Sequence, residues 1–147
     1  MENMENMGKK LTKVYNEIFK NSKIEIFKNS FSGNNVLWVR LYLAQNEEEE
    51  INGYFINDMF SILFKITKVE ENNYIIENKH SRYNVKPTNK YLVYENKKVA
   101  FRKTQGNEEK IITTFKKYVE KLHNALVEDL EQGNIHENYI ELLKKKI

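Results

Sequence analysis

FSILFKITKVEENNYIIENK, residues 60–79, is the stretch that decides the fold. Its first half places an apolar residue at every second position from Phe60 to Ile66. This period of two is typical of a β-strand with one buried face. The polar residues 71–73 then favour a turn, and a second apolar run follows over 73–79. The stretch therefore predicts an antiparallel β-hairpin.

Further strands are expected on both sides of this hairpin. KIEIF (23–27) and VLWVRLYLA (36–44) precede it, while KYLVYE (90–95) and KVAFRK (98–103) follow it as a second hairpin. In the segment 36–44 both alternating faces are apolar. The face that carries Val36, Trp38, Arg40 and Tyr42 is too apolar to be simply solvated. We therefore expect a central strand, or a strand whose outer face is covered by a helix.

Helical periodicity is found at both ends of the chain. Apolar residues recur at steps of three and four over 11–19, over 111–130 and over 135–143. Asn107 is expected to cap the start of the second helix and Gly133 to follow its end. The predicted class is α+β: an antiparallel sheet of about five or six strands, flanked by an N-terminal helix and two C-terminal helices. Residues 1–8 are expected to be a disordered or frayed tail, and residues 9–147 a single domain.

The composition excludes several classes of protein. The chain of 147 residues contains no cysteine, which rules out disulfides and thiolate chemistry. It has no leader-like N-terminus and no apolar run long enough to span a membrane, so a cytoplasmic protein is expected. The frequent Lys, Asn, Ile, Glu and Tyr are typical of AT-rich coding, as in low-GC bacteria and their phages.

No catalytic or metal-binding signature stands out. His80 is a lone histidine without a positioned nucleophile, and a role for it as a general base stays open. Glu120 and His123 have the spacing of a di-metal helix motif, but the second such motif that this site requires is missing. The five glycines are isolated, so there is no phosphate-binding loop. We expect a protein that is not an enzyme and that holds no cofactor or metal.

Charge is unevenly distributed along the chain, although the net charge is only +3. Residues 41–77 carry two bases and eight acids, whereas residues 79–103 carry eight bases and one acid. Such a polarised field can steer a partner more strongly than the net charge suggests.

The basic segment 79–103 also contains aromatic residues, and lysine or arginine beside aromatic rings is typical of surfaces that bind unpaired nucleic acid. Some of these rings must be buried in a sheet, so the segment is either an ordinary basic sheet face or a working surface. The candidate partner- or nucleic-acid-binding residues are Lys79, Arg82, Tyr83, Lys86, Tyr94, Lys97, Lys98, Arg102 and Lys103.

The acidic run of Glu47, Glu48, Glu49 and Glu50 is the second candidate surface. It is interpreted as a solvated loop, as a contact patch for a basic partner, or as a weak cation site.

Two functions are expected to compete. The first is a small non-enzymatic protein of phage or mobile-element type, acting as a stoichiometric inhibitor of a host nucleic-acid-handling complex, as anti-CRISPR proteins do. Its partner would be a host protein or ribonucleoprotein complex, held by the charged patches. The alternative is direct binding of RNA or single-stranded DNA by segment 79–103. No membrane contact is expected, and the protein is a monomer or a homodimer, with the apolar outer face of Val36, Trp38 and Tyr42 or the last helix as candidate contacts.

Overall fold

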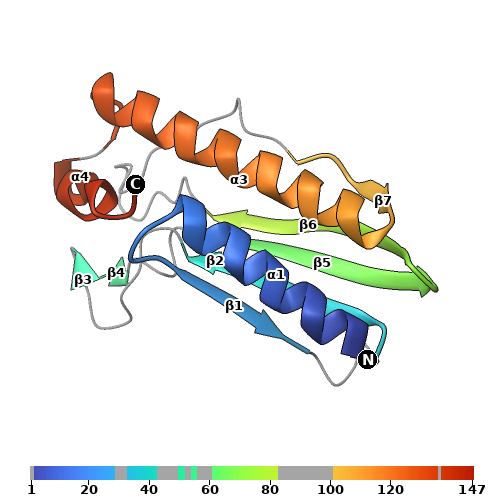
Figure 1. Ribbon diagram of the computed structural model, residues 1–147. Coiled ribbons are helices and arrows are strands. Elements are labelled where there is room, and N and C mark those ends of the chain that lie inside the picture. The colour runs from blue at the N-terminus through green and yellow to red at the C-terminus, as the bar shows by residue number, and fades with distance from the viewer. Residues whose placement is uncertain are drawn as a thin grey trace.

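The computed structural model describes residues 2–28, 33–42, 50–51, 54–55, 61–82, 101–135 and 137–147 (Figure 1). In chain order the elements are α1 (Glu2–Ile18), β1 (Lys23–Phe27), β2 (Val36–Tyr42), β3 (Glu50–Ile51), β4 (Tyr54–Phe55), β5 (Ser61–Glu70), β6 (Asn73–Arg82), β7 (Thr104–Gly106), α3 (Glu108–Glu131) and α4 (Glu137–Lys144).

A five-stranded sheet with the order β1-β2-β5-β6-β7 is the centre of the fold. Each neighbouring pair of strands in it is antiparallel. The two-residue strands β3 and β4 pair separately. The predicted α+β class with an antiparallel sheet is thus confirmed. Strand β2 lies between β1 and β5, which confirms its expected central position in the sheet.

The hairpin predicted over residues 60–79 is confirmed as β5 and β6, two strands of ten residues each. Asn72 lies in the turn between them with a φ of 52°. Asparagine tolerates this left-handed conformation better than most residues, which explains its place in the turn. The inward side chains of β5, from Ile62 to Ile66, are fully buried at every second position.

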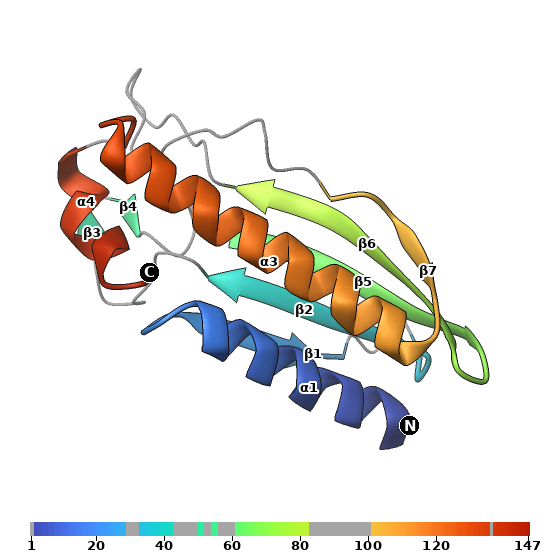
Figure 2. The same cartoon turned by 45° about the horizontal axis from the view of Figure 1, so that its top comes forward.

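Helices α1 and α3 lie side by side over the same face of the sheet (Figures 1 and 2). Their apolar side chains form one core with the inward residues of β2, β5 and β6. Phe64 is at its centre, with ring centroids 5.0 Å from Phe101, 5.8 Å from Phe115 and 5.4 Å from Tyr118. No described helix covers the opposite side of the sheet, which we call the outer face.

The expected frayed tail over residues 1–8 is wrong. Helix α1 begins at Glu2, and Met4 and Met7 are fully buried in the core. These methionines continue the stripe of Leu11 and Tyr15 at helical spacing, so their burial stabilises the first turns. The contact with the sheet is close, because a Cβ atom on Gly8 would lie only 2.9 Å from Ile26 Cγ2.

Both ends of α3 follow the predicted capping. The Asn107 side chain accepts a hydrogen bond of 2.8 Å from the Lys110 amide, and Glu108 and Glu109 occupy the first turn. Gly133, with a φ of 73°, follows the C-cap residue Gln132. This conformation carries a steric cost for residues with a Cβ atom and none for glycine.

Two expectations about the C-terminal half need correction. Only α3 flanks the sheet from this half, because the eight-residue α4 lies beyond the end of the sheet (Figure 1). A strand was also expected over residues 98–103, but the described part of this range, residues 101–103, is not in a strand. The strand in this region is β7, which pairs with Tyr74–Ile76 of β6. Among the described helices, none combines the length and apolarity needed to cross a membrane.

Candidate functional site

Aromatic and basic side chains alternate on the outer face of the sheet. The pleat of β2 sends Leu37, Val39 and Leu41 into the core and the side chains between them to the other side. The side chains of the neighbouring strands join them in register. The outer-face set that we consider consists of Lys23, Phe27, Trp38, Arg40, Tyr42 and Lys65, each partly exposed.

The first row across this face contains Phe27, Trp38 and Lys65. Trp38 is paired with Phe27 of β1 on one side and with Lys65 of β5 on the other. The rings of Phe27 and Trp38 are nearly parallel, with centroids 6.4 Å apart and an interplanar angle of 15°. The Lys65 amine lies 5.8 Å from the centre of the Trp38 ring. The row therefore presents two rings and one cation side by side, and it continues on β6 with Glu77, which pairs with Lys65.

Arg40 and Tyr42 continue the alternation along β2. The Arg40 guanidinium lies 5.7 Å from the Phe27 ring centre and 6.0 Å from that of Tyr42. The Lys23 amine lies 5.3 Å from the Tyr42 ring. The Tyr42 hydroxyl donates a hydrogen bond of 3.2 Å to the carboxylate of Glu25, an acid on the same face. Each ring on this face thus has a cation within about 6 Å, the usual range of a cation–π contact.

The residues predicted from segment 79–103 are only partly covered by the structure. Lys79 is exposed in β6, and Arg82 is the last residue of that strand. Arg102 and Lys103 are exposed just before β7. Because Ile76 pairs with Thr104, Lys79 and Arg102 lie beyond the same end of the β6–β7 ladder. Tyr83, Lys86, Tyr94, Lys97 and Lys98 lie outside the described residues.

The structure describes only one residue of the acidic run. Glu50 begins β3 and pairs with Phe55, so this residue is in a strand and not in a loop. Glu47, Glu48 and Glu49 lie outside the described residues. The acidic contact patch therefore remains a prediction.

The structure places the backbone of His80 and the ring of His123. His80 pairs with Leu63 in the β5–β6 hairpin. The ring of His123 packs edge-on against Phe19, with centroids 5.3 Å apart, and its Nε2 atom lies 3.5 Å from the carbonyl oxygen of Ile147. His123 thus connects α3, α1 and the C-terminus. The described residues contain no group of three or more side chains suited to hold a metal ion.

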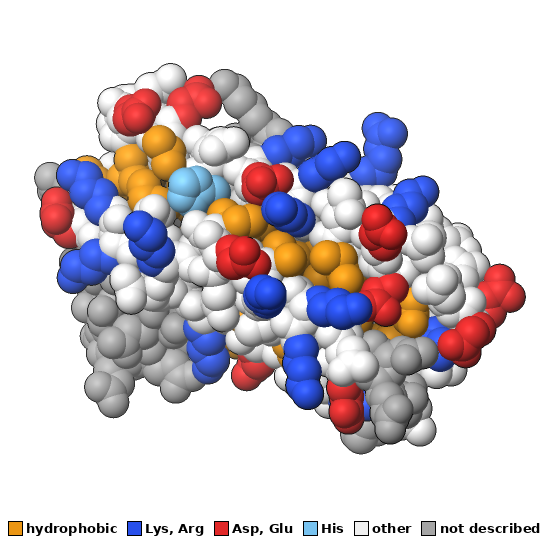
Figure 3. All heavy atoms as spheres, in the orientation of Figure 1, with side chains coloured by type: hydrophobic (Ala, Val, Ile, Leu, Met, Phe, Trp, Pro, Cys, Tyr) orange, Lys and Arg blue, Asp and Glu red, His pale blue; other side chains and the backbone are white. Residues whose placement is uncertain are grey.

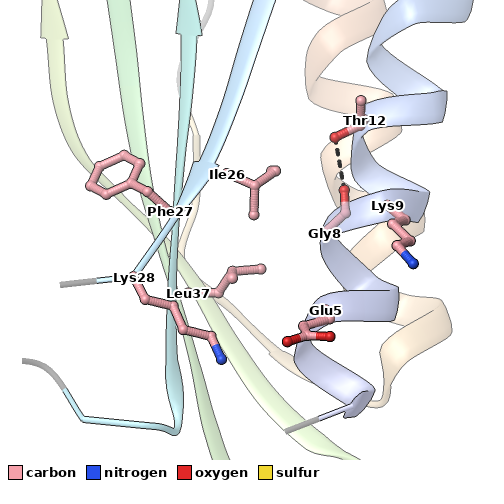
Figure 4. Close-up of a pocket in the computed structure, with 8 residues that line it drawn as sticks. All are labelled: Glu5, Gly8, Lys9, Thr12, Ile26, Phe27, Lys28 and Leu37. Carbon is pink, nitrogen blue, oxygen red and sulfur yellow. Dashed lines mark hydrogen bonds between the residues drawn. The ribbon is translucent and has the colours of Figure 1, made fainter. Parts of the chain in front are cut away.

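An apolar hollow of about 450 Å³ lies between α1 and β1 (Figure 4). Ile26 and Leu37 point into it, and Gly8 forms part of its helical wall. Glu5 and Lys28 lie across its mouth, whereas the ring of Phe27 points away, toward the outer face (Figure 4). The Thr12 hydroxyl on its wall donates a hydrogen bond of 2.9 Å to the Gly8 carbonyl oxygen. Specific small-molecule sites have polar groups that converge on the ligand, and this hollow has an apolar interior.

The outer-face set was missed by sequence reasoning, although its signal is in the segment VLWVRLY. Trp38, Arg40 and Tyr42 alternate there with aliphatic residues, and the pattern was interpreted as a covered or dimer-forming face. The deciding fact is that both long helices lie on the same side of the sheet, and no local pattern reports this.

Searches with this chain against known protein families, curated proteins and solved structures find no match.

Proposed function

We propose that this protein binds single-stranded nucleic acid, RNA or DNA, on the outer face of its sheet and catalyses no reaction. The observation that carries the proposal is the alternation of three rings, Phe27, Trp38 and Tyr42, with three cations across two neighbouring strand pairs. This is the combination that single-strand binding requires, since unpaired bases stack on aromatic rings and phosphates are held by lysine and arginine.

The interaction energies favour replacement of the cation–π contacts on this face by contacts with a bound strand. A cation–π contact at an exposed site contributes about 0.5–1 kcal/mol. Stacking of a base on an aromatic side chain contributes about 1–3 kcal/mol. A cation displaced from a ring remains within reach of the neighbouring phosphate and releases counterions there. A bound strand thus replaces weak contacts within the protein by stronger ones to the ligand.

Arg40 has a central place in this mechanism. It lies between Phe27 and Tyr42, so bases stacked on both rings would bring the connecting phosphate toward its guanidinium. The planar guanidinium can donate two parallel hydrogen bonds to one phosphate. We expect Arg40 to position the strand, while Trp38 supplies the largest stacking surface.

The inhibitor function is a separate prediction. Three of its four acidic residues and three of its seven basic residues lie outside the described part of the chain, so the outer face is the better supported surface. The two functions differ in one respect that can be measured. An inhibitor retains a defined protein partner from a nuclease-treated extract, whereas a nucleic-acid-binding protein loses what it captured through nucleic acid.

The experiment that tests the proposal is a salt titration of the affinity for a labelled single-stranded oligonucleotide. We expect the affinity to fall with salt, with a slope of about 0.7 per phosphate contact. The double variant Arg40→Gln/Lys65→Gln should bind more weakly and lower the slope by about 1.4.

The matched control is Lys13→Gln/Lys116→Gln, which removes two exposed lysines from the helices on the opposite side of the sheet. This control should bind as the wild-type protein does. Equal losses in both double variants would show that binding depends on charge in general, and the outer face would then be rejected as the site.

A further inference from the structure

A second basic site lies on the helical side of the molecule, in a hollow of about 190 Å³ between α3 and the segment that leads into β7. We call it the basic pocket. Among the described residues its rim carries Arg102, Lys117 and Lys121. Figure 3 shows several Lys and Arg side chains on this side of the molecule, with Asp and Glu side chains among them. None of the residues that line the basic pocket belongs to the outer-face set.

The cations of the basic pocket have no acidic partner within the described residues. Lys117 and Lys121 are separated by one helical turn, so their exposed side chains are neighbours on α3. A pair of like charges at this spacing destabilises a helix by about 0.2–0.5 kcal/mol. Arg102 adds a third positive charge from a different element. A bound anion would turn this repulsion into attraction.

The walls of the pocket determine which anion fits. The Thr104 hydroxyl donates a hydrogen bond of 3.0 Å to the Arg102 carbonyl, which holds the backbone that presents the Arg102 side chain. Thr114 contributes a hydroxyl from α3. The floor consists of Phe101 and Tyr118, whose rings meet edge to face at 5.3 Å. A rim of cations and a hydroxyl over an aromatic floor suits a compact oxyanion.

The size of the hollow favours a small group. Its volume is below the range of about 300–1,000 Å³ found for drug-sized ligands. Arginine and lysine together are typical of phosphate sites, since the guanidinium donates a pair of hydrogen bonds and the amines add point charges. We propose that the basic pocket binds a phosphate group, either from a small phosphorylated molecule or from a nucleic-acid strand. This site is independent of single-strand binding on the outer face.

The test is a titration of the full-length ¹⁵N-labelled protein with sodium pyrophosphate at constant ionic strength, followed by NMR. We expect saturable shifts of the backbone amides of residues 102–104 and 114–121. The double variant Lys117→Ala/Lys121→Ala should weaken pyrophosphate binding at least about tenfold, because it removes two charge-assisted contacts. Lys116→Ala is the matched control: Lys116 is an exposed lysine of the same helix that does not line the pocket.

The source of the phosphate is found by a second titration with oligonucleotides that carry a 5′-phosphate or a 5′-hydroxyl group, using Trp38→Ala to weaken the outer face. Tighter binding of the 5′-phosphorylated oligonucleotide identifies a nucleic-acid end as a ligand. Equal binding of the two oligonucleotides identifies a small phosphorylated molecule as the ligand. Both outcomes agree with a phosphate site in the basic pocket. The proposal is overturned if pyrophosphate causes no saturable shifts, or if Lys116→Ala weakens its binding as much as the double variant does.

Discussion

Lys65 faces Trp38 directly across the β2–β5 ladder, and its amine lies 5.8 Å from the centre of the indole ring. The ring also lies beside Phe27 of β1. Trp38 therefore stands between a cation and a second ring on a side of the sheet that no described helix covers. This arrangement is the basis for the proposal that the outer face binds unpaired bases.

Replacement of Trp38 by alanine should weaken binding of a single-stranded oligonucleotide by about 1–3 kcal/mol, the usual contribution of one stacked base. Trp38→Phe should retain most of the affinity, because it keeps a ring at the same place. Fluorescence anisotropy of a labelled oligonucleotide measures both variants. Equal losses in Trp38→Phe and Trp38→Ala would argue against stacking at this position.

Replacement of Phe64 by alanine should lower the free energy of unfolding by about 3–5 kcal/mol. Phe64 is fully buried and has three aromatic neighbours, so its removal leaves a cavity between the sheet and α3. Phe64→Leu should be clearly less harmful, since it fills part of that cavity. Urea unfolding followed by circular dichroism measures the difference. A loss below 1 kcal/mol in Phe64→Ala would contradict the central place of this ring.

Lys146 is expected to stabilise the fold although its side chain is charged and buried. It is only 5% exposed, and its amine donates a hydrogen bond to the Asn21 carbonyl. Removal of this bond in Lys146→Ala should lower the free energy of unfolding by about 1–3 kcal/mol. The neighbouring Lys145 is exposed, and Lys145→Ala should change stability by less than about 0.5 kcal/mol. Thermal unfolding of the two variants provides the comparison, and similar melting temperatures would refute this role.

Tyr15 should make the fold sensitive to alkaline pH. Burial raises the pKa of the Tyr15 hydroxyl. The 2.5 Å hydrogen bond with Ser22 lowers this pKa, but by less than burial raises it. In the unfolded chain the group ionises near its ordinary pKa of about 10. Above that pH the unfolded state loses the proton first, so stability is unaffected below it and falls as pH rises further.

Tyr15→Phe removes the ionisable group and should flatten this decline above about pH 10. The measurement is the urea midpoint as a function of pH for both proteins. Parallel curves for the wild-type protein and Tyr15→Phe would show that another group causes the alkaline loss.

The elements with a clear local period could be predicted from the sequence. The β5–β6 hairpin follows from alternation over residues 60–79, and the ends of α3 follow from Asn107 and Gly133. The start of α1 had a signal that was overlooked, since Met4, Met7 and Leu11 have helical spacing. The two repeats of MEN were interpreted as a tail, but the buried methionines belong to the core stripe.

The candidate sites could be predicted only in part, because they depend on contacts between distant segments. Arg102 was expected on a basic surface, but the helix residues Lys117 and Lys121 that share its pocket lie outside segment 79–103. Trp38 and Lys65 are distant in the sequence and meet only through the β2–β5 register. Composition showed that bases and rings were abundant, and the fold determined which of them lie together.

The most direct test of the outer-face proposal uses the intrinsic fluorescence of Trp38, which is the only tryptophan in the sequence. A single-stranded oligonucleotide is titrated into the protein, and binding is measured in parallel by anisotropy of a label on the oligonucleotide. We predict that the tryptophan emission is quenched with the same saturation curve as the anisotropy, because a base stacks on the indole. Binding by anisotropy with unchanged tryptophan emission, or no binding at all, would contradict the proposal.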